Sequence, residues 1–279
     1  MKQVMITTSI VLAIGIFLLW FVYYQDNHLV VTSYEYSSSD ISKEFDGYKI
    51  VQLSDLHDKQ FGENQEKLIS HIDSINPDAI FLTGDFVTKK SIEYSTELIE
   101  KLSEKYEMFF VTGNHEARHA TYHEFKKVLI ENNVHMINNE AFTITKGESH
   151  LNIVGLQDLA FYRTSEKNQE KKFERKLKDL TKDLTGPTLL LSHRPEYIDV
   201  YSKYDVNLVF SGHAHGGQFI LPFVGSVYST DQGLFPELTR GEHEKDGTTM
   251  IISRGLGNLA PVPRLFNYPE IVVVTLHSA

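Results

Sequence analysis

The distribution of hydrophobic residues predicts alternating strands and helices in the first half of the chain and mainly strands in the second half. Short apolar runs alternate with segments in which apolar residues recur every three or four positions, which is typical of β-α-β units. The expected strands are residues 48–53, 78–82, 108–111, 152–156, 188–191, 206–210, 248–252 and 271–276, and the expected helices are 68–75, 92–102, 125–129 and a Lys-rich segment at 173–184. This order predicts a layered α/β fold with more than one sheet.

The N-terminal segment is different, because residues 4–24 carry no charge. Twenty-one residues in a helix span about 31 Å, close to the hydrocarbon thickness of a bilayer. Lys2 precedes the segment and Asp26 follows it, which predicts a cytoplasmic N-terminus and an extracytoplasmic domain. A cleaved signal peptide is the alternative, but the run is longer than usual and no small-residue cleavage site follows it. We therefore expect a single-pass cell-membrane anchor (1–24), a polar linker (25–47) and one folded domain (48–279).

Composition removes several classes of function. The chain has no Cys, which excludes disulfide scaffolds, thiolate metal sites and a cysteine nucleophile. Lys and Arg total 27 against 37 Asp and Glu, and no basic patch is apparent, so a nucleic-acid partner is not expected. No protein partner can be inferred. The 13 His residues are unusual, because imidazole together with carboxylate is how a chain without Cys would bind a transition metal.

Polar clusters follow five of the predicted strands. They are residues 54–58, 84–85, 113–116, 192–193 and 212–217. The carboxyl ends of strands in open α/β sheets converge on the ligand crevice, so these clusters are expected to meet.

The spacing within the clusters indicates metal binding. Asp55 and His57 are two residues apart, as are His213 and His215, and side chains at this spacing point the same way in an extended chain. The two carboxylate oxygens of Asp85 can bridge two cations, and the adjacent glycine permits close approach. Seven candidate ligands are more than one tetrahedral ion needs and suit two metals. They are Asp55, His57, Asp85, Asn114, His193, His213 and His215. This mixture of ligands favours Mn, Zn or Fe.

The clusters occur in the order D-x-H, G-D, G-N-H-[DE], H and G-H-x-H, and over residues 48–276 the chain resembles the calcineurin-like metallophosphoesterases. The surrounding residues resemble a bacterial membrane-associated branch related to UDP-2,3-diacylglucosamine hydrolases. The segments that carry this finer resemblance are 193–196, 215–218, 253–258 and 268–271.

The resemblance implies a fold, a reaction and a role for each ligand. The fold is a four-layer αββα sandwich of two mixed sheets, here preceded by one transmembrane helix. The reaction is hydrolysis of phosphoester or pyrophosphate bonds by a water that two divalent ions activate. The implied roles are Asp55, His57 and His215 at the first metal, Asn114, His193 and His213 at the second, Asp85 as the bridge, and His115 as a catalytic residue rather than a ligand.

The substrate is expected to be close to the membrane. Phospholipids or lipid-linked pyrophosphates rank first, cell-wall phosphodiesters second and soluble nucleotides last. Arg194, Arg254 and Arg264 are candidate phosphate contacts, because a guanidinium group fits phosphate oxygens. The apolar residues 219–224 are expected to form a core strand, and contact with a lipid tail is the alternative.

Two other sequence patterns have competing interpretations. His115-Glu116-Ala117-Arg118-His119 matches the H-E-x-x-H pattern of zinc proteases, so a membrane-anchored zinc protease is the alternative function. Its position directly after a strand predicts a loop rather than the required helix. Residues 255–260 match a dinucleotide fingerprint, but Pro261 and Pro263 deny it a following helix, which predicts a loop. A catalytically silent metal-binding protein is a third hypothesis, and the intact His115 argues against it.

Overall fold

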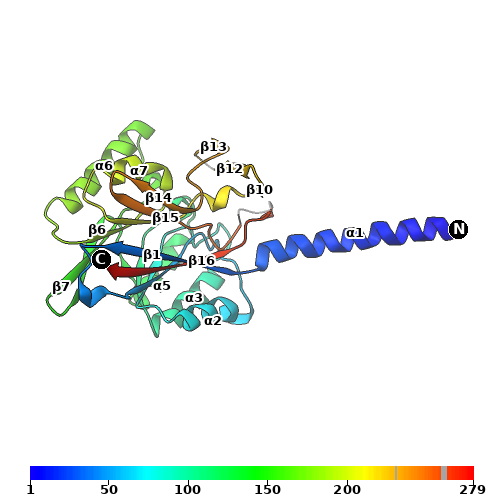
Figure 1. Ribbon diagram of the computed structural model, residues 1–279, viewed down its shortest axis with the longest axis horizontal. Helices are drawn as coiled ribbons and strands as arrows, with labels where there is room; N and C mark the ends of the chain where they lie inside the picture. Colours follow the sequence, from blue (N-terminus) through cyan, green and yellow to red (C-terminus); the bar gives the residue numbers. More distant parts are fainter. Residues whose placement is uncertain (230, 259–262) are drawn as a thin grey trace.

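Two six-stranded β-sheets pack face to face in the structure, a computed structural model that describes residues 1–229, 231–258 and 263–279. Helices cover the outer face of each sheet, and one long helix extends away from the domain (Figure 1). The result is an α/β sandwich of four layers, which confirms the predicted fold class.

The first sheet has the strand order β1-β16-β2-β3-β4-β5. Strands β2 to β5 run parallel, β16 is antiparallel to β2, and β1 is parallel to β16. The strands are β1 (Val30–Ser38), β2 (Lys49–Leu53), β3 (Ala79–Leu82), β4 (Glu107–Phe110), β5 (His135–Met136) and β16 (Glu270–Ser278). Helices α2 (Glu66–Ile75), α3 (Glu93–Ser103) and α5 (Tyr122–Glu131) pack their apolar stripes against this sheet.

The second sheet has the strand order β14-β15-β9-β8-β7-β6, with four parallel central strands and one antiparallel strand at each edge. The strands are β6 (Glu140–Lys146), β7 (Ser149–Gly155), β8 (Thr188–Leu191), β9 (Leu208–Ser211), β14 (Gly241–Lys245) and β15 (Thr248–Ile252). Helices α6 (Glu166–Thr181) and α7 (Ile198–Tyr201) cover it. In α6, Phe173 and Leu177 are buried while the Lys residues face solvent, as the pattern predicts.

Aromatic side chains fill the space between the two sheets. The ring of Phe81 lies 5.0 Å from that of Phe210 and 5.7 Å from that of Phe109, measured between centroids. Both sheets therefore share one apolar core, which holds the ends of their strands in a fixed relation.

The remaining elements are short. They are α4 (Asn114–Arg118), the β10–β11 hairpin (Ile220–Leu221 and Gly225–Ser226), the pair β12 (Tyr228–Ser229) and β13 (Gly233–Leu234), and the 3-10 helices Lys43–Phe45, Glu63–Gln65, Leu159–Phe161, Pro195–Tyr197 and His215–Gly217.

The structure differs from the predicted linker at residues 25–47, because β1 lies inside this range and pairs with β16. Side chains of β1 alternate between half-buried and exposed, so this edge strand lacks the apolar run that identified the central strands. The edge strands β6 and β14 escaped prediction for the same reason.

The prediction of a core strand at residues 219–224 is wrong. Only Ile220–Leu221 form a strand, and Ile220 is buried whereas Phe223 is fully exposed. The predicted loop at 255–260 is present as far as Asn258, and residues 259 and 260 lie outside the described part of the chain.

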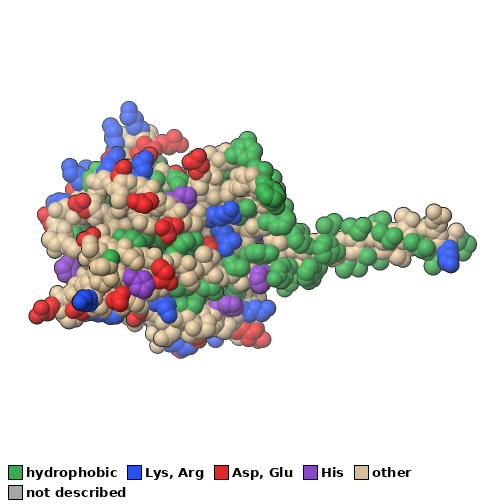
Figure 2. Space-filling model, viewed as in Figure 1, with side chains coloured by type: hydrophobic (Ala, Val, Ile, Leu, Met, Phe, Trp, Pro, Cys, Tyr) green, Lys and Arg blue, Asp and Glu red, His purple; other side chains and the backbone are tan. Residues whose placement is uncertain are grey.

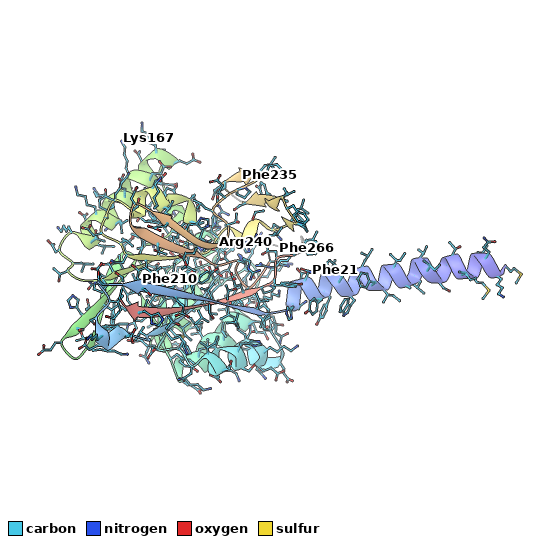
Figure 3. The ribbon with its side chains drawn as sticks, in the orientation of Figure 1. Phe21, Lys167, Phe210, Phe235, Arg240 and Phe266 are labelled. Carbon is cyan, nitrogen blue, oxygen red and sulfur yellow. The ribbon has the colours of Figure 1, made fainter. Side chains whose placement is uncertain are left out.

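The N-terminal helix α1 (Lys2–Asn27) is long and apolar enough to cross a membrane, and its apolar side chains are exposed over most of its length (Figure 2). Its last turns are attached to the domain, where the ring of Phe21 lies 5.9 Å from that of Phe266 (Figure 3). Gln25 is buried and donates to the hydroxyl of Tyr268 at 3.3 Å. These contacts hold the end of α1 against the domain.

Candidate metal centre

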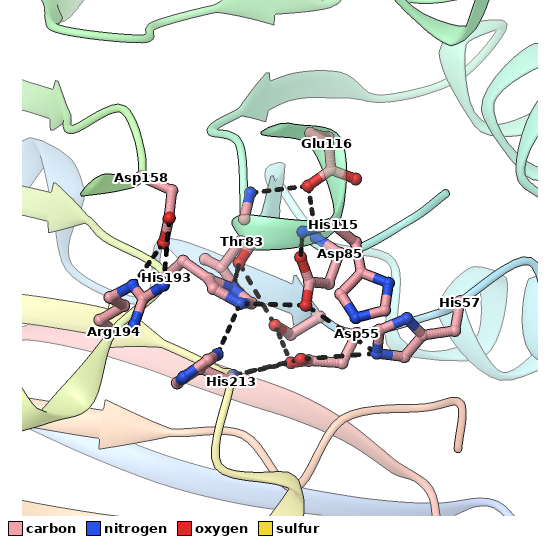
Figure 4. Close-up of polar contacts among 12 residues, drawn as sticks. Asp55, His57, Thr83, Asp85, His115, Glu116, Asp158, His193, Arg194 and His213 are labelled. Carbon is pink, nitrogen blue, oxygen red and sulfur yellow. Dashed lines mark hydrogen bonds and ion pairs between the residues drawn. The ribbon is translucent and has the colours of Figure 1, made fainter. Parts of the chain in front are cut away.

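The side chains predicted to meet do so at the carboxyl ends of β2, β3, β4, β8 and β9 (Figure 4). Within each of two groups of side chains, the candidate ligand atoms lie within 4.8 Å of one another. A third group adds His115 beside Asp85 and His57, and a fourth joins His213 to Glu196 and Asp231. The first group is Asp55, His57 and His215, and the second is Asp85, His193 and His213. All six of these side chains are buried.

Asp85 lies between the two groups. One of its carboxylate oxygens is 3.3 Å from Nε2 of His193 in the second group and 4.0 Å from Nε2 of His57 in the first. In the first group, Nε2 of His215 lies 3.3 Å from the Asp55 carboxylate. This arrangement suits two cations that share one carboxylate.

The protonation of the imidazoles fits cation binding. Burial, with a contribution from His215, lowers the pKa of His57 to about 3, and burial lowers the pKa of His215 as well. Their Nε2 atoms face each other at 3.1 Å, so the first group offers neutral rings. Burial also lowers the pKa of His193, but the Asp85 carboxylate outweighs this effect and raises it to about 10. A cation bound there would replace the His193 proton.

Asn114 offers a further test of whether these side chains fit bound cations. Its side chain is buried, and its Oδ1 atom has no hydrogen-bond partner among the described residues. A buried carbonyl oxygen without a partner is costly, and a cation would satisfy it. The donors therefore fit two divalent ions, and mixed imidazole, carboxylate and amide ligation is typical of Mn, Zn or Fe.

The backbone at the ligands is not the extended chain predicted from the two-residue spacing. Five ligands have left-handed φ values, which are unfavourable for residues other than glycine and mark functional sites. They are Asp55 (52°), His57 (47°), Asp85 (58°), His213 (65°) and His215 (48°). Tight turns at the strand ends, rather than alternation along a strand, therefore place these side chains.

Gly84 has a different role from the one predicted for it. Its φ is 91°, and a Cβ atom at this position would overlap the backbone of Gly113. The absence of both side chains lets the loops after β3 and β4 touch, which brings Asp85 next to the segment that carries Asn114 and His115.

Hydrogen bonds orient several ligands. Nδ1 of His193 donates to the carbonyl oxygen of Thr83 at 2.7 Å, which leaves Nε2 facing Asp85. The hydroxyl of Ser54 and the backbone N–H of His213 donate to Asp55 at 2.5 and 3.0 Å. Such contacts set the tautomer and the direction of a ligand before the metal binds.

Asp231 is a contributor that sequence reasoning missed. Its carboxylate accepts from Nε2 of His213 at 3.0 Å and from Arg194 at 2.6 Å. These two interactions, that of His213 first, hold the pKa of Asp231 well below its usual range. Asp231 belongs to no motif and lies in the connection between β12 and β13, so no sequence signal identifies it.

The position of Glu116 excludes the zinc-protease interpretation. Its buried carboxylate accepts hydrogen bonds from the backbone N–H groups of Asp85, Phe86 and Gly113 at 2.7–2.8 Å, so it joins two loops and cannot serve as a free base. The loop predicted here is wrong, because residues Asn114–Arg118 form helix α4. The helix ends before His119, which belongs to no metal-binding group among the described residues.

His115 lies at the edge of the centre. Its ring is half-buried and 4.5 Å from that of His57 between centroids, and its backbone N–H donates to Asp85 at 2.7 Å. Burial lowers its pKa, and its Nδ1 atom has no hydrogen-bond partner among the described residues. His115 therefore lies beside Asp85 and the first group of metal-binding side chains.

The three candidate phosphate-binding arginines have different surroundings. Arg194 borders the centre and pairs with Asp158 at 2.7 Å as well as with Asp231. Arg254 pairs with Glu270 at 2.8 Å. Arg264 is buried, and its guanidinium donates to Gly257 and Asn258 near the end of α1, which is a structural position. Arg194 meets the metal-binding side chains through Asp231, and the charge of Arg264 adds to burial in lowering the pKa of His215.

A cavity of about 680 Å³ adjoins the centre through Arg194 and Asp231. Its walls are mainly polar and include Arg118, Glu166, Gln169, Glu170, Glu196 and Tyr197. A cavity of this kind fits a polar group better than an acyl chain.

Comparison with known proteins identifies the family. The family model of the calcineurin-like phosphoesterases matches residues 48–217, which contain the five polar clusters. An uncharacterized metallophosphoesterase of Bacillus subtilis, YkuE, is 30% identical over 265 residues that cover 91% of this chain and 88% of that protein.

One further relative and one solved structure have more specific names. The UDP-2,3-diacylglucosamine pyrophosphatase LpxG of Chlamydia muridarum is 27% identical over 324 aligned positions, which cover 96% of this chain and 95% of that protein. The crystal structure of phosphopantetheinyl hydrolase from Mycobacterium tuberculosis matches 74% of this chain and 89% of its own, with 14% identity and a TM-score of 0.48.

Proposed function

The chain belongs to the calcineurin-like phosphoesterase family, and we propose that it is a membrane-anchored enzyme that uses two metals to hydrolyse a phosphoester or pyrophosphate bond in a lipid-linked or other cell-envelope substrate. The observation that carries this proposal is the position of Asp85 between two buried groups of metal-binding side chains.

The residues divide between two ions. Asp55, His57 and His215 would hold the first, and Asn114, His193 and His213 would hold the second, with Asp85 between them. When bound, two such cations polarise the phosphorus centre and lower the pKa of water so that hydroxide is accessible near neutral pH. Thr83, Ser54 and Asp231 keep the ligands in the orientations that this requires.

His115 acts on the leaving group in this proposal. The backbone N–H of His115 donates to Asp85 and so holds the residue beside the centre. This hydrogen bond does not use the imidazole, which is free to approach the departing oxygen. A positioned imidazole can give that oxygen a proton. Arg194 borders the adjoining cavity, where its guanidinium is available to a phosphate that competes with Asp231.

The proposed substrate class rests on two observations. Helix α1 would keep the centre near a bilayer. LpxG, which aligns with nearly the whole chain, is named for a pyrophosphatase that acts on a diacylated sugar nucleotide. The polar cavity suits the head group of such a molecule.

We further propose that the catalytic domain is extracytoplasmic. Lys2 is the first residue of α1 and Asp26 lies in its last turn, and the positive charge is retained on the cytoplasmic side. Protease added to intact spheroplasts should then digest the domain, whereas protection until lysis would place the domain in the cytoplasm.

Hydrolysis assays on the full-length protein in nanodiscs test the reaction. After chelation, Mn, Zn and Fe are supplied separately, and a chromogenic diester, a chromogenic monoester and a lipid-linked pyrophosphate are offered. We expect metal-dependent release of phosphate or a monoester that Asp85→Asn abolishes. The proposal is wrong if no metal supports any of these reactions in protein that has bound metal.

A further inference from the structure

Exposed hydrophobic side chains gather on one edge of the catalytic domain. Beyond residue 28, the described part of the chain exposes nine large hydrophobic side chains, and seven of them belong to residues 221–235 or to Phe266. The six in the first group are Leu221, Phe223, Val224, Tyr228, Leu234 and Phe235. Together with Phe266 we call them the apolar edge. Scattered exposed apolar residues are normal, but such a concentration marks an interaction surface.

Neither a backbone preference nor packing in the core explains why aromatic residues occupy the apolar edge. Phe223 lies in the turn of the β10–β11 hairpin with a φ of 66°, and Phe235 follows β13 with a φ of 54°. Glycine, Asn or Asp would adopt these left-handed positions at lower cost. Both rings are exposed, so they do not stabilise the core in return. A partner outside the chain would explain them.

The apolar edge lies on the side of the domain from which α1 departs. Figure 1 shows β10, β12 and β13 facing the same direction as α1, and Figure 2 shows hydrophobic surface at this side next to the base of the helix. The contact between Phe21 and Phe266 joins the two surfaces, and Figure 3 shows Phe235 farther along the same side.

The attachment of α1 restricts where this edge can face. Gln25 is buried against Tyr268, and the Asp26 carboxylate accepts from Asn258 and from the backbone N–H of Arg264 at 2.8 and 2.7 Å. These contacts therefore hold the domain directly against the end of α1. The last turns of α1 carry Trp20 and Tyr24, which are typical of the level of the lipid head groups.

We propose that the apolar edge inserts into the head-group layer of the bilayer that α1 crosses. The inference rests on the proposed role of α1 as a membrane anchor, and it adds a second membrane contact that orients the domain. The partner of the apolar edge is lipid, because this edge continues the apolar surface of α1 at the level where the helix leaves the membrane.

The loops that carry the apolar edge also reach the metal centre. Asp231, between β12 and β13, contacts His213 and Arg194, so the loops that meet the lipid border the side chains that bind the metals. A phosphoester on a lipid can thus reach the centre while its acyl chains stay in the bilayer.

Fluorescence quenching in vesicles tests the proposal, and the absence of Cys allows a single probe to be placed at will. The full-length variants Phe223→Cys, Phe235→Cys, Ile130→Cys and Leu12→Cys are labelled with an environment-sensitive dye. They are reconstituted in phosphatidylethanolamine and phosphatidylglycerol vesicles that carry a quencher at the head group or in the middle of the acyl chain. Ile130 is the matched control, because it is exposed and lies on α5. Circular dichroism and thermal unfolding check that each variant folds.

We expect the head-group quencher to reduce fluorescence at positions 223 and 235 several-fold more than at position 130. The acyl-chain quencher should act on position 12. If position 12 is quenched while 223 and 235 behave like 130, the apolar edge does not contact lipid and a protein partner is the better explanation. If position 12 is not quenched either, the anchor itself is wrong and this inference falls with it. Both outcomes are independent of whether the protein hydrolyses phosphoesters.

Discussion

Nε2 of His213 lies 3.0 Å from the carboxylate of Asp231, a residue in another loop that no sequence motif includes. An ionised carboxylate can only accept a hydrogen bond, so this contact keeps a proton on Nε2 and leaves the lone pair of Nδ1 directed toward His193 and Asp85. Asp231 therefore determines which nitrogen of His213 is available to a metal.

Replacing Asp231 should weaken the second metal site. Asp231→Asn keeps the size of the side chain and tolerates the left-handed backbone, but removes the charge. We expect the affinity for the second metal to fall by roughly 10- to 100-fold. Metal titration monitored by calorimetry measures the change. Asp246→Asn, in the exposed turn between β14 and β15, is the matched control, and equal affinities in the two variants would contradict the role of Asp231.

The shared position of Asp85 predicts an unequal effect of two substitutions. Asp85→Asn should lower the metal content at both sites, whereas His57→Ala should mainly affect one, because His57 belongs to the first group. Elemental analysis of each purified protein after saturating metal supply measures both. A wild-type chain that holds no more than one transition metal would rule out the two-metal centre.

His115 is expected to be needed for catalysis and not for metal binding. In His115→Ala both metals should remain, while the rate falls by roughly 10²–10⁴, the range for loss of a positioned general acid. The loss should be smaller on a nitrophenyl ester, since nitrophenolate departs without a proton. Metal content and the rates on an alkyl and a nitrophenyl ester are measured on one preparation. Loss of a metal, or equal loss of rate on both esters, would count against His115 as the proton donor.

Glu116 should stabilise the fold around the centre. Its carboxylate joins the loops after β3 and β4 by accepting hydrogen bonds from four backbone N–H groups. Removing the carboxylate in Glu116→Ala leaves these donors buried without partners, and we expect a loss of about 2–4 kcal/mol in the free energy of unfolding. Denaturant unfolding of the metal-free protein measures this loss. Glu124→Ala, at an exposed position on α5, should have little effect, and the proposed role fails if the two variants are equally stable.

Binding of the second metal should depend on pH. Because Asp85 raises the pKa of His193 to about 10, the metal-free ring carries a proton at neutral pH that must leave when a cation binds. The apparent affinity should therefore rise with pH, by about tenfold per unit for one released proton, and level off near the pKa of His193. Calorimetry in buffers of different ionisation enthalpy counts the proton. An affinity that does not change between pH 6.5 and 8.5, a span of about two units chosen below that pKa, would contradict this prediction.

The amino-acid sequence by itself determined the central strands, their helices and the grouping of polar residues at the strand ends. These features depend on neighbouring residues, since a buried strand needs an apolar run and a helix needs apolar residues at a fixed period. The order of the five polar clusters therefore predicted that Asp55, Asp85, His193 and His213 would meet, and the structure brings them together.

Only the tertiary structure decided the contacts that join distant segments. The strands β1, β6 and β14 lie at sheet edges, where a half-exposed strand needs no apolar run, and their partners become known only once the sheets are assembled. Glu116 belongs to a recognisable motif, but its hydrogen bonds depend on the close packing of two loops at Gly84 and Gly113. Asp231 and Phe223 lie in loops whose local sequence has no periodic pattern. The fold places the loop of Asp231 against the metal ligands and the β10–β11 hairpin of Phe223 on the side of the domain from which α1 extends. Contacts between residues so far apart in sequence are set by packing and not by local propensity.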